Sequence, residues 1–306
     1  MGLDAAREPE EAFERSVSAG VRTALTLIRT RFEASEDPLD RLEYHNAHHT
    51  QQVIERARRI AGAIRSADPA AISRRDFGLS TIAASFHDTV QKYRIVTEQE
   101  SAYEKRVRVR SAGSNEEGSA QNAKEYMAQH REAFREGDVK IVREAILATF
   151  TEFDEERKTV VRRNLTEHSG IVARVLALAD LGAAGMETGH TFLLESDALF
   201  REDNIDIREA MEHVDTIELD RKAFFRQRML AWSDRQVAFV ESRKEALESE
   251  LEGLSELAKA AVRLLFTEFK SNIDGARAKT VERTSMTFED LARDMGYEPR
   301  VRGSLA

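Results

Sequence analysis

The sequence predicts an all-α fold. Only four prolines and fifteen glycines interrupt the 306 residues, so long helices can form with few breaks. Apolar residues recur at helical spacing, and no stretch alternates as a set of paired strands would. Charged residues make up 33% of the chain and hydrophobic residues 41%, which is typical of a soluble helical protein. We therefore expect one large helical domain, or a domain with an extension.

The N-terminal part of the chain is expected to form three helices and then a charged segment. Residues 1–10 are polar and acidic, so we predict a flexible N-terminus there. An amphipathic helix follows over about residues 11–34, a second begins near His45, and a third covers about residues 76–91. Residues 92–114 are rich in charge and are predicted to be irregular.

Helices also account for most of the remaining chain. The expected helices cover about residues 115–135, 138–153, 164–186, 190–200 and 206–218, and a long one begins near Arg221 and breaks before Arg243. These elements divide into a flexible N-terminus (1–10), a main domain (11–235) and a C-terminal helical extension (236–306).

A narrow apolar seam runs along the expected extension. Its members follow one another at four- and three-residue steps: Leu247, Leu251, Leu254, Ala258, Ala261 and Leu265. Such a seam pairs with another subunit or packs against its own domain. We favour a homodimer through these helices, because so long an extension has few surfaces left to cover within one subunit.

Charge and composition exclude several kinds of protein. A net charge of -9 argues against a nucleic-acid backbone as the main partner. No run approaches the roughly 20 apolar residues that span a bilayer, so no membrane partner is expected. The polar N-terminus does not resemble a secretory signal, and the lack of cysteine excludes disulfides and thiolate catalysis. These features favour a cytoplasmic location.

Four potential metal ligands lie at the ends of, or inside, apolar helical stretches. They are His49, His87, Asp88 and Asp180. Imidazole and carboxylate together suit a divalent ion such as Mn, Mg, Fe, Co, Ni or Zn. Burying these groups unpaired would cost on the order of several kcal/mol, and a bound cation removes that cost. The sequence therefore predicts a metal site.

Helical spacing turns two of these candidates toward the core. His49 lies one turn before Val53 and so begins the buried face of its helix. Asp180 follows Leu176 inside an apolar run, with no basic residue one turn away on either side. Taken singly, each residue also fits a core hydrogen bonder with no ligand role. Together they favour a shared cation.

Three short motifs contain these residues, in the order Y-H-N-x-x-H at Tyr44–His49, F-H-D at Phe86–Asp88 and A-D-L at Ala179–Leu181. In this order on an all-α chain they resemble the HD-domain metal-dependent phosphohydrolase superfamily. The segment NEEGSA at Asn115–Ala120 is similar to the small soluble branch of predicted HD phosphohydrolases, and the YHN element resembles that of cyclic-nucleotide phosphodiesterases. The resemblance covers about residues 20–235 and implies an HD-domain helical bundle.

The resemblance also implies roles for individual residues. His49, His87, Asp88 and Asp180 correspond to the metal ligands of the family, whose chemistry is hydrolysis of a phosphate ester by metal-activated water. His45 matches the phosphodiesterase histidine that protonates the leaving alkoxide, and an imidazole can donate a proton near neutral pH. The alternative for His45 is a helix-terminal residue that only packs.

Glu116 is the preferred candidate for holding a metal-bound water. It shares a helix face with Ala120 and Ala123, which we expect to be buried. Its neighbour Glu117 can instead close a capping box with Ser114.

The segment after the HD pair departs from the family pattern. Residues 91–114 form a longer connection than expected, and Phe153 stands where relatives often have a histidine. Lys92 lies one turn beyond Asp88, where its ammonium group is a candidate clamp for a substrate phosphate. The alternative for this segment is a solvated charged loop.

The leading function is hydrolysis of a phosphate mono- or diester, with a small phosphorylated substrate such as a nucleotide as the expected partner. A non-catalytic, metal-stabilised regulatory or scaffold module is the main alternative. An HD-type di-iron oxygenase is a further one, but it needs extra histidines between the HD pair and the last aspartate. Only His130 and His168 lie there.

Overall fold

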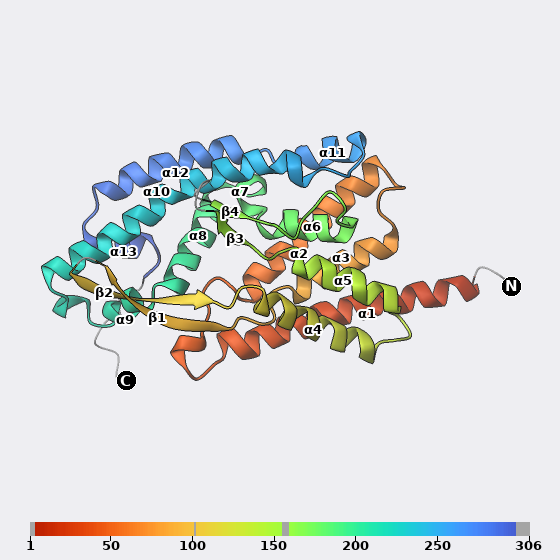
Figure 1. Ribbon diagram of the computed structural model, residues 1–306, viewed down its shortest axis with the longest axis horizontal. Coiled ribbons are helices and arrows are strands. Elements are labelled where there is room, and N and C mark those ends of the chain that lie inside the picture. The colour runs from red at the N-terminus through yellow and green to blue at the C-terminus, as the bar shows by residue number, and fades with distance from the viewer. Residues whose placement is uncertain (1–3, 101, 155–158, 298–306) are drawn as a thin grey trace.

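The protein is built mainly of helices. The computed structural model describes residues 4–100, 102–154 and 159–297 (Figure 1). The helices are α1 (Asp4–Ile28), α2 (Ala47–Ala67), α3 (Arg74–Phe86), α4 (Ser114–Gln129), α5 (Glu136–Leu147), α6 (Ile171–Asp180), α7 (Ala183–Met186), α8 (Gly189–Asp203), α9 (Ile205–Met211), α10 (Leu219–Glu250), α11 (Glu256–Arg263), α12 (Phe269–Thr284) and α13 (Phe288–Asp294). The predicted all-α class is confirmed. None of the helices in the described ranges has both the length and the apolar character needed to cross a membrane.

Two small antiparallel hairpins interrupt the helices. Strand β1 (Tyr93–Glu100) pairs with β2 (Tyr103–Arg110), and β3 (Glu152–Asp154) pairs with β4 (Thr159–Val161). The register places Val96 opposite Val107. The prediction that residues 92–114 are irregular is therefore wrong. In β2 valines alternate with arginines, but the buried side chain is Arg108 and not a valine, and in β1 the apolar Ile95 and Val96 are adjacent, so the pattern of a half-buried strand is not sustained over both strands.

Several helix boundaries also differ from the prediction. α1 already begins at Asp4, so most of the expected flexible N-terminus is helical, and residues 1–3 lie outside the described ranges. α2 begins at Ala47, because the Asn46 side chain accepts a hydrogen bond from the His49 amide and caps the helix. α10 continues to Glu250 without the break expected before Arg243.

Two main apolar cores organise the helices, and a third, small apolar cluster surrounds Phe32. The larger core contains buried residues of α1 to α6 together with residues of α10, α11 and α12. The smaller core joins the end of α8 and α9 to the beginning of α10 and to α13. α10 therefore contributes to both cores, and it packs along α12 on one long edge of the molecule (Figure 1).

The apolar seam of the C-terminal region packs inside the subunit. Leu247, Leu251, Leu254 and Ala258 are buried in the larger core, and α11 lies against α2. These four positions are covered by the chain itself and offer no surface to a second subunit. The homodimer through the seam is therefore corrected to packing within one subunit, and a dimer through other faces of these helices stays a prediction. The expected boundary at residues 235 and 236 falls inside α10.

Candidate metal centre

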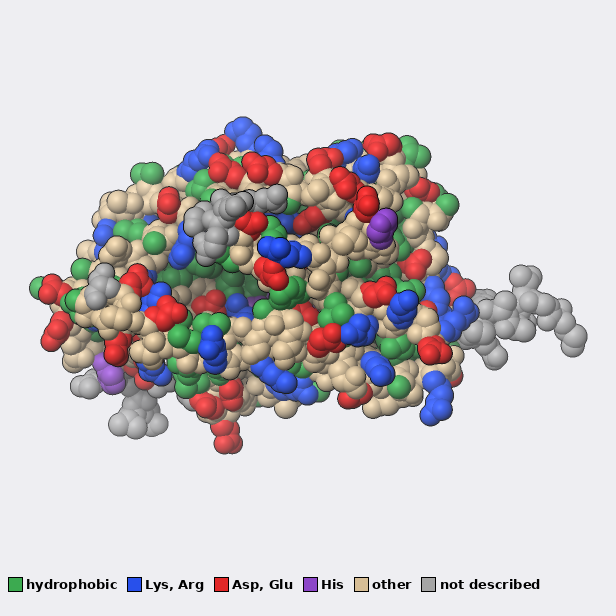
Figure 2. All heavy atoms as spheres, viewed as in Figure 1, with side chains coloured by type: hydrophobic (Ala, Val, Ile, Leu, Met, Phe, Trp, Pro, Cys, Tyr) green, Lys and Arg blue, Asp and Glu red, His purple; other side chains and the backbone are tan. Residues whose placement is uncertain are grey.

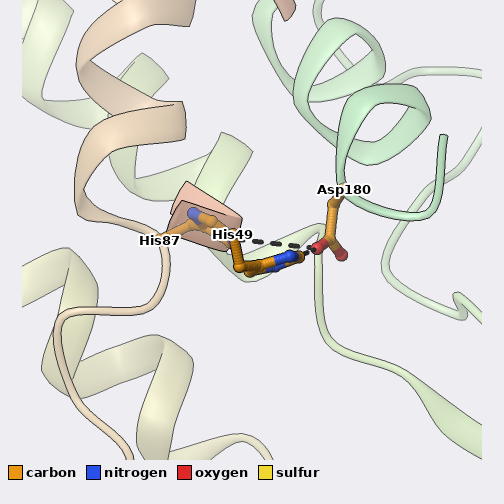
Figure 3. A group of neighbouring side chains, drawn as sticks. All are labelled: His49, His87 and Asp180. Atoms are coloured by element: carbon orange, nitrogen blue, oxygen red, sulfur yellow. Dashed lines mark ion pairs between the residues drawn. The ribbon is translucent and has the colours of Figure 1, made fainter. Parts of the chain in front are cut away.

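Three helix ends bring the four predicted ligands together. His49 lies in the first turn of α2, His87 and Asp88 follow the last residue of α3, and Asp180 is the last residue of α6. These three helices pack against one another. Figure 3 shows His49 and His87 directed toward the Asp180 carboxylate. The structure thus places residues separated by more than a hundred positions at one point.

The distances between these side chains suit a shared cation. His87 Nε2 lies 3.1 Å from Asp88 Oδ2 and 3.6 Å from Asp180 Oδ1. His49 Nε2 lies 3.5 Å and 3.9 Å from the same two oxygens. Ligand atoms bound at about 2.0–2.2 Å to one ion lie roughly 3–4 Å from one another. The ligand atoms of His49, His87 and Asp180 all lie within 4.8 Å of one another.

Buried ring nitrogens without a hydrogen-bond partner indicate that a cation fits between these side chains. The His87 Nδ1–H group donates to the Ala84 carbonyl oxygen at 2.8 Å, which directs the Nε2 lone pair toward the two carboxylates. Both ring nitrogens of His49 and Nε2 of His87 are buried without a hydrogen-bond partner among the described residues. The two imidazoles and the Asp180 carboxylate form a donor set that fits a divalent ion, and Asp88 Oδ2 lies 3.5 Å or less from Nε2 of each histidine.

The electrostatics of the cluster agree with this fit. Burial opposes a charge on His87, but the carboxylates of Asp88 and Asp180 outweigh it and hold the His87 pKa well above its usual value. For Asp88, burial favours the neutral acid, but His87 and His45 lower its pKa well below the ordinary range. The negative charge of the carboxylates therefore dominates the site, and it attracts a proton or a metal cation.

Asp180 has a second partner that the sequence does not reveal. Its Oδ1 faces the two histidines, whereas its Oδ2 accepts a hydrogen bond from Arg162 Nη2 at 2.9 Å. Burial alone would raise the Asp180 pKa. The hydrogen bond and charge of His87 and the charge of Arg162 outweigh burial and lower the pKa to about 2. Arg162 follows β4 and reaches Asp180 only through the tertiary fold. The absence of a basic residue one helical turn away therefore did not mean that Asp180 lacks a basic partner.

His45 is held beside the metal ligands by Glu202. Its Nδ1 lies 2.6 Å from Glu202 Oε1, and its ring centroid lies 6.0 Å from that of His49. Glu202 Oε2 accepts hydrogen bonds from the backbone amides of Tyr44 and His45 at 2.7 and 3.0 Å. Glu202 lies in the last turn of α8, and the sequence gives no local sign that it contacts His45.

The first hairpin supplies two arginines to the same region. Arg110 Nη2 lies 3.0 Å from Glu202 Oε1 and 2.7 Å from Asp203 Oδ1. Arg108 is buried and donates to the backbone carbonyls of Glu202 and Leu39. Arg108 therefore anchors β2, while Arg110 places a cation next to the carboxylate that holds His45.

Glu195 lies on the other side of His49. Its Oε2 is 3.9 Å from His49 Nδ1, and its other oxygen pairs with the buried Arg56 guanidinium. The Tyr44 ring lies against His49, with ring centroids 4.2 Å apart. The Tyr44 ring thus packs on the His49 imidazole while Glu195 lies beyond hydrogen-bond distance of it, and neither residue was predicted as a neighbour of His49.

The structure does not bring the other two predicted site residues into contact with the four ligands. Glu116 Oε2 accepts a hydrogen bond from the Gly113 amide at 2.6 Å and so caps α4, whereas Glu117 pairs with Arg143. The capping role expected for Glu117 thus belongs to Glu116. Burial raises the Glu116 pKa, and the charges of Asp88 and Asp180 add to this effect.

Lys92 is exposed at the beginning of the hairpin. Its backbone amide donates to Asn115 Oδ1 at 2.7 Å, and its ammonium group forms no ion pair within the described ranges. The cation that the fold brings to the site from this segment is Arg110. Figure 2 shows a hollow on this face of the molecule, in the region between the two hairpins, with charged side chains around it.

No family model, curated protein or solved structure matches this chain. The three motifs and the geometry of their residues therefore carry the functional argument.

Proposed function

We propose that this protein is a metal-dependent hydrolase of a small phosphate mono- or diester, with nucleotides among its substrates. The buried nitrogens of His49 and His87, unpartnered and facing two carboxylates, carry the proposal. A divalent cation bound by these histidines with Asp88 and Asp180 would supply Lewis-acid chemistry, by lowering the pKa of water and neutralising phosphoryl charge. Membership of the HD-domain superfamily and a cytoplasmic location belong to the same proposal.

His45 is the proposed general acid. Glu202 engages its Nδ1, so Nε2 is the ring nitrogen available for a proton transfer to the leaving-group oxygen. The His45 side chain is 12% exposed, whereas that of Glu202 is 1% exposed. Glu202 therefore orients the imidazole from its buried Nδ1 side, and the substrate approaches the exposed side of the ring.

Arg110 is the proposed phosphate-binding cation. One nitrogen of its guanidinium contacts Glu202 and Asp203, which leaves the remaining N–H groups for an anion. Its position beside Glu202 Oε1, which also contacts His45, puts it close to the proposed acid. A phosphate ester held by Arg110 and by a cation at the centre would thus have its leaving group near His45.

The oxygenase alternative has less support from the structure. His130 packs on Tyr126 and pairs with Glu132, and His168 is exposed. Neither belongs to the ligand cluster formed by the described residues. Phe153, at the position where relatives often have a histidine, is 53% exposed on β3.

Metal analysis combined with an activity screen tests the proposal. Wild-type protein and the His49→Ala and Asp180→Ala variants are loaded with Mn²⁺, Zn²⁺ or Fe²⁺ and assayed for phosphate release from a panel of mono- and diesters. Both variants should lose metal and activity together. His48→Ala is the matched control, because His48 is exposed and adjoins His49 in the same turn.

The outcomes separate the functional classes. A wild-type protein that binds metal but hydrolyses no ester supports the regulatory module. Iron accompanied by oxygen uptake supports the oxygenase. A wild-type protein that binds none of the metals refutes the metal centre itself.

A further inference from the structure

Four charges of alternating sign, three of them buried, connect the proposed metal centre to the C-terminal end of α10. Asp180 contacts Arg162, Arg162 Nη1 lies 3.6 Å from Glu250 Oε1, and Glu250 pairs with Arg243. The side chains of Arg162, Glu250 and Arg243 are 1%, 9% and 6% exposed. We call these four residues the charge chain. It runs from a proposed metal ligand to two residues of α10 that follow Asp180 by more than sixty positions.

The charge chain is costly for the fold. Arg162 has two buried N–H groups, at Nε and Nη1, without a hydrogen-bond partner among the described residues. Arg243 Nε is likewise buried without a hydrogen-bond partner among the described residues. Buried ion pairs of this kind often contribute less to stability than apolar residues of similar size. Fold stability therefore does not account for a charged guanidinium at position 162.

The geometry at Asp180 gives the guanidinium a different role. Arg162 takes Oδ2, and this leaves Oδ1 directed at the imidazoles of His49 and His87. A carboxylate with one oxygen occupied in this way presents the other as a single, oriented donor. Groups that orient ligands in this manner typically change metal affinity by about 10–100-fold when they are removed.

We propose that Arg162 is a positioning residue for Asp180, and that Glu250 and Arg243 hold Arg162 in place from α10. This inference rests on the proposed metal centre. It implies that the end of α10, which is linked to Asp180 through Arg162, sets the affinity of the site for a cation.

Two opposing effects of Arg162 have to be separated in a test. Its positive charge repels a metal cation, while its hydrogen bond aligns Asp180. Removing Arg162 alone would also make the net charge near the site more negative, with Arg243 as the remaining partner of Glu250, and this change would attract the cation. The Arg162→Met/Glu250→Gln double variant avoids this problem, because it removes one positive and one negative charge and keeps the net charge.

Co²⁺ titration followed by visible absorption is the experiment, since the spectrum reports coordination geometry as well as affinity. The double variant should bind Co²⁺ about 10–100-fold more weakly than wild type and show an altered spectrum. Arg162→Lys, which retains the charge and one donor, should recover part of the affinity. The matched control is Arg283→Met/Asp197→Asn, because this pair is equally buried but belongs to another part of the core.

The possible outcomes distinguish a failure of the proposed metal centre from a failure of the positioning role of Arg162. If the wild-type protein binds no Co²⁺, the proposed metal centre fails. If wild type binds and the Arg162 variants match it in affinity and spectrum, the positioning role is overturned. A loss of affinity in the Arg283/Asp197 control equal to that in the double variant also overturns it, because general destabilisation would then explain both. If the double variant does not fold, the Co²⁺ affinity and spectrum of the single variants Arg162→Lys and Glu250→Gln are compared with those of wild type instead. Values equal to wild type in both variants would again overturn the positioning role.

Discussion

One oxygen of Glu202 contacts both His45 and Arg110: Oε1 lies 2.6 Å from His45 Nδ1 and 3.0 Å from Arg110 Nη2. The proposed proton donor and the proposed anion-binding cation are therefore held side by side by one buried carboxylate. Because each can be altered without touching the proposed metal ligands, their contributions can be measured separately.

His45→Ala should keep the metal content of wild type and reduce turnover. General acid catalysis typically contributes about 10²–10⁴-fold, so a loss of this size is expected on alkyl phosphate esters. The loss should be smaller on nitrophenyl esters, whose leaving group needs little protonation. Turnover and metal content measured on both ester types check this. An equal loss on both, or loss of the metal, would mean that His45 is not the acid.

Arg110→Met should raise KM more than it lowers kcat. A hydrogen bond to a charged group contributes about 1.5–3 kcal/mol, which corresponds to roughly a 10–100-fold change in KM. Arg108→Met is the control, because Arg108 lies on the same strand but is buried against backbone carbonyls. The control should lower the free energy of unfolding. If both variants change KM equally, Arg110 acts only through the placement of β2.

Leu251→Ala should destabilise the subunit without changing its assembly. Leu251 is fully buried in the larger core, so the truncation should cost about 2–5 kcal/mol of unfolding free energy. Leu257→Ala is the matched control, since Leu257 is 66% exposed on the neighbouring helix. Urea unfolding with light scattering measures both properties. A change of oligomeric state in Leu251→Ala at unchanged stability would restore the seam as a subunit interface.

Asp203 should make stability depend on pH. Burial raises the Asp203 pKa to about 6, despite the nearby Arg110. The folded state then holds this proton more tightly than the unfolded state. Its stabilising effect is complete below the ordinary aspartate pKa and disappears as the pH rises through about 6.

The Asp203→Asn variant tests whether the free energy of unfolding contributed by Asp203 falls as the pH rises. The free energy of unfolding of the variant, relative to wild type, should rise by about 1–3 kcal/mol between pH 4 and pH 7. The lower part of this range allows for the 27% exposure of the Asp203 side chain. Parallel pH profiles for the two proteins would show that the carboxyl group titrates normally.

The sequence was sufficient to predict residues that face the core of a regular helix. His49 and Asp180 follow the apolar periodicity of α2 and α6, so their burial could be inferred from the spacing of apolar residues alone. Glu202 and Arg162 could not be predicted as their partners, because they come from other elements and only tertiary packing brings them close. Glu116 shows the limit of local reasoning, since the helix cap lies at Gly113, one residue before the expected Ser114, and the capping glutamate is therefore Glu116 and not Glu117.

The path of α10 has a consequence for how the protein can be divided. Its first half contributes Phe225 and Met229 to the smaller core, and its second half contributes Val240 and Leu247 to the larger one. A fragment that ends near residue 235 would cut this helix midway and expose the apolar surface that its second half covers. We expect such a fragment to aggregate, and we expect the two cores of the intact chain to melt in one cooperative transition.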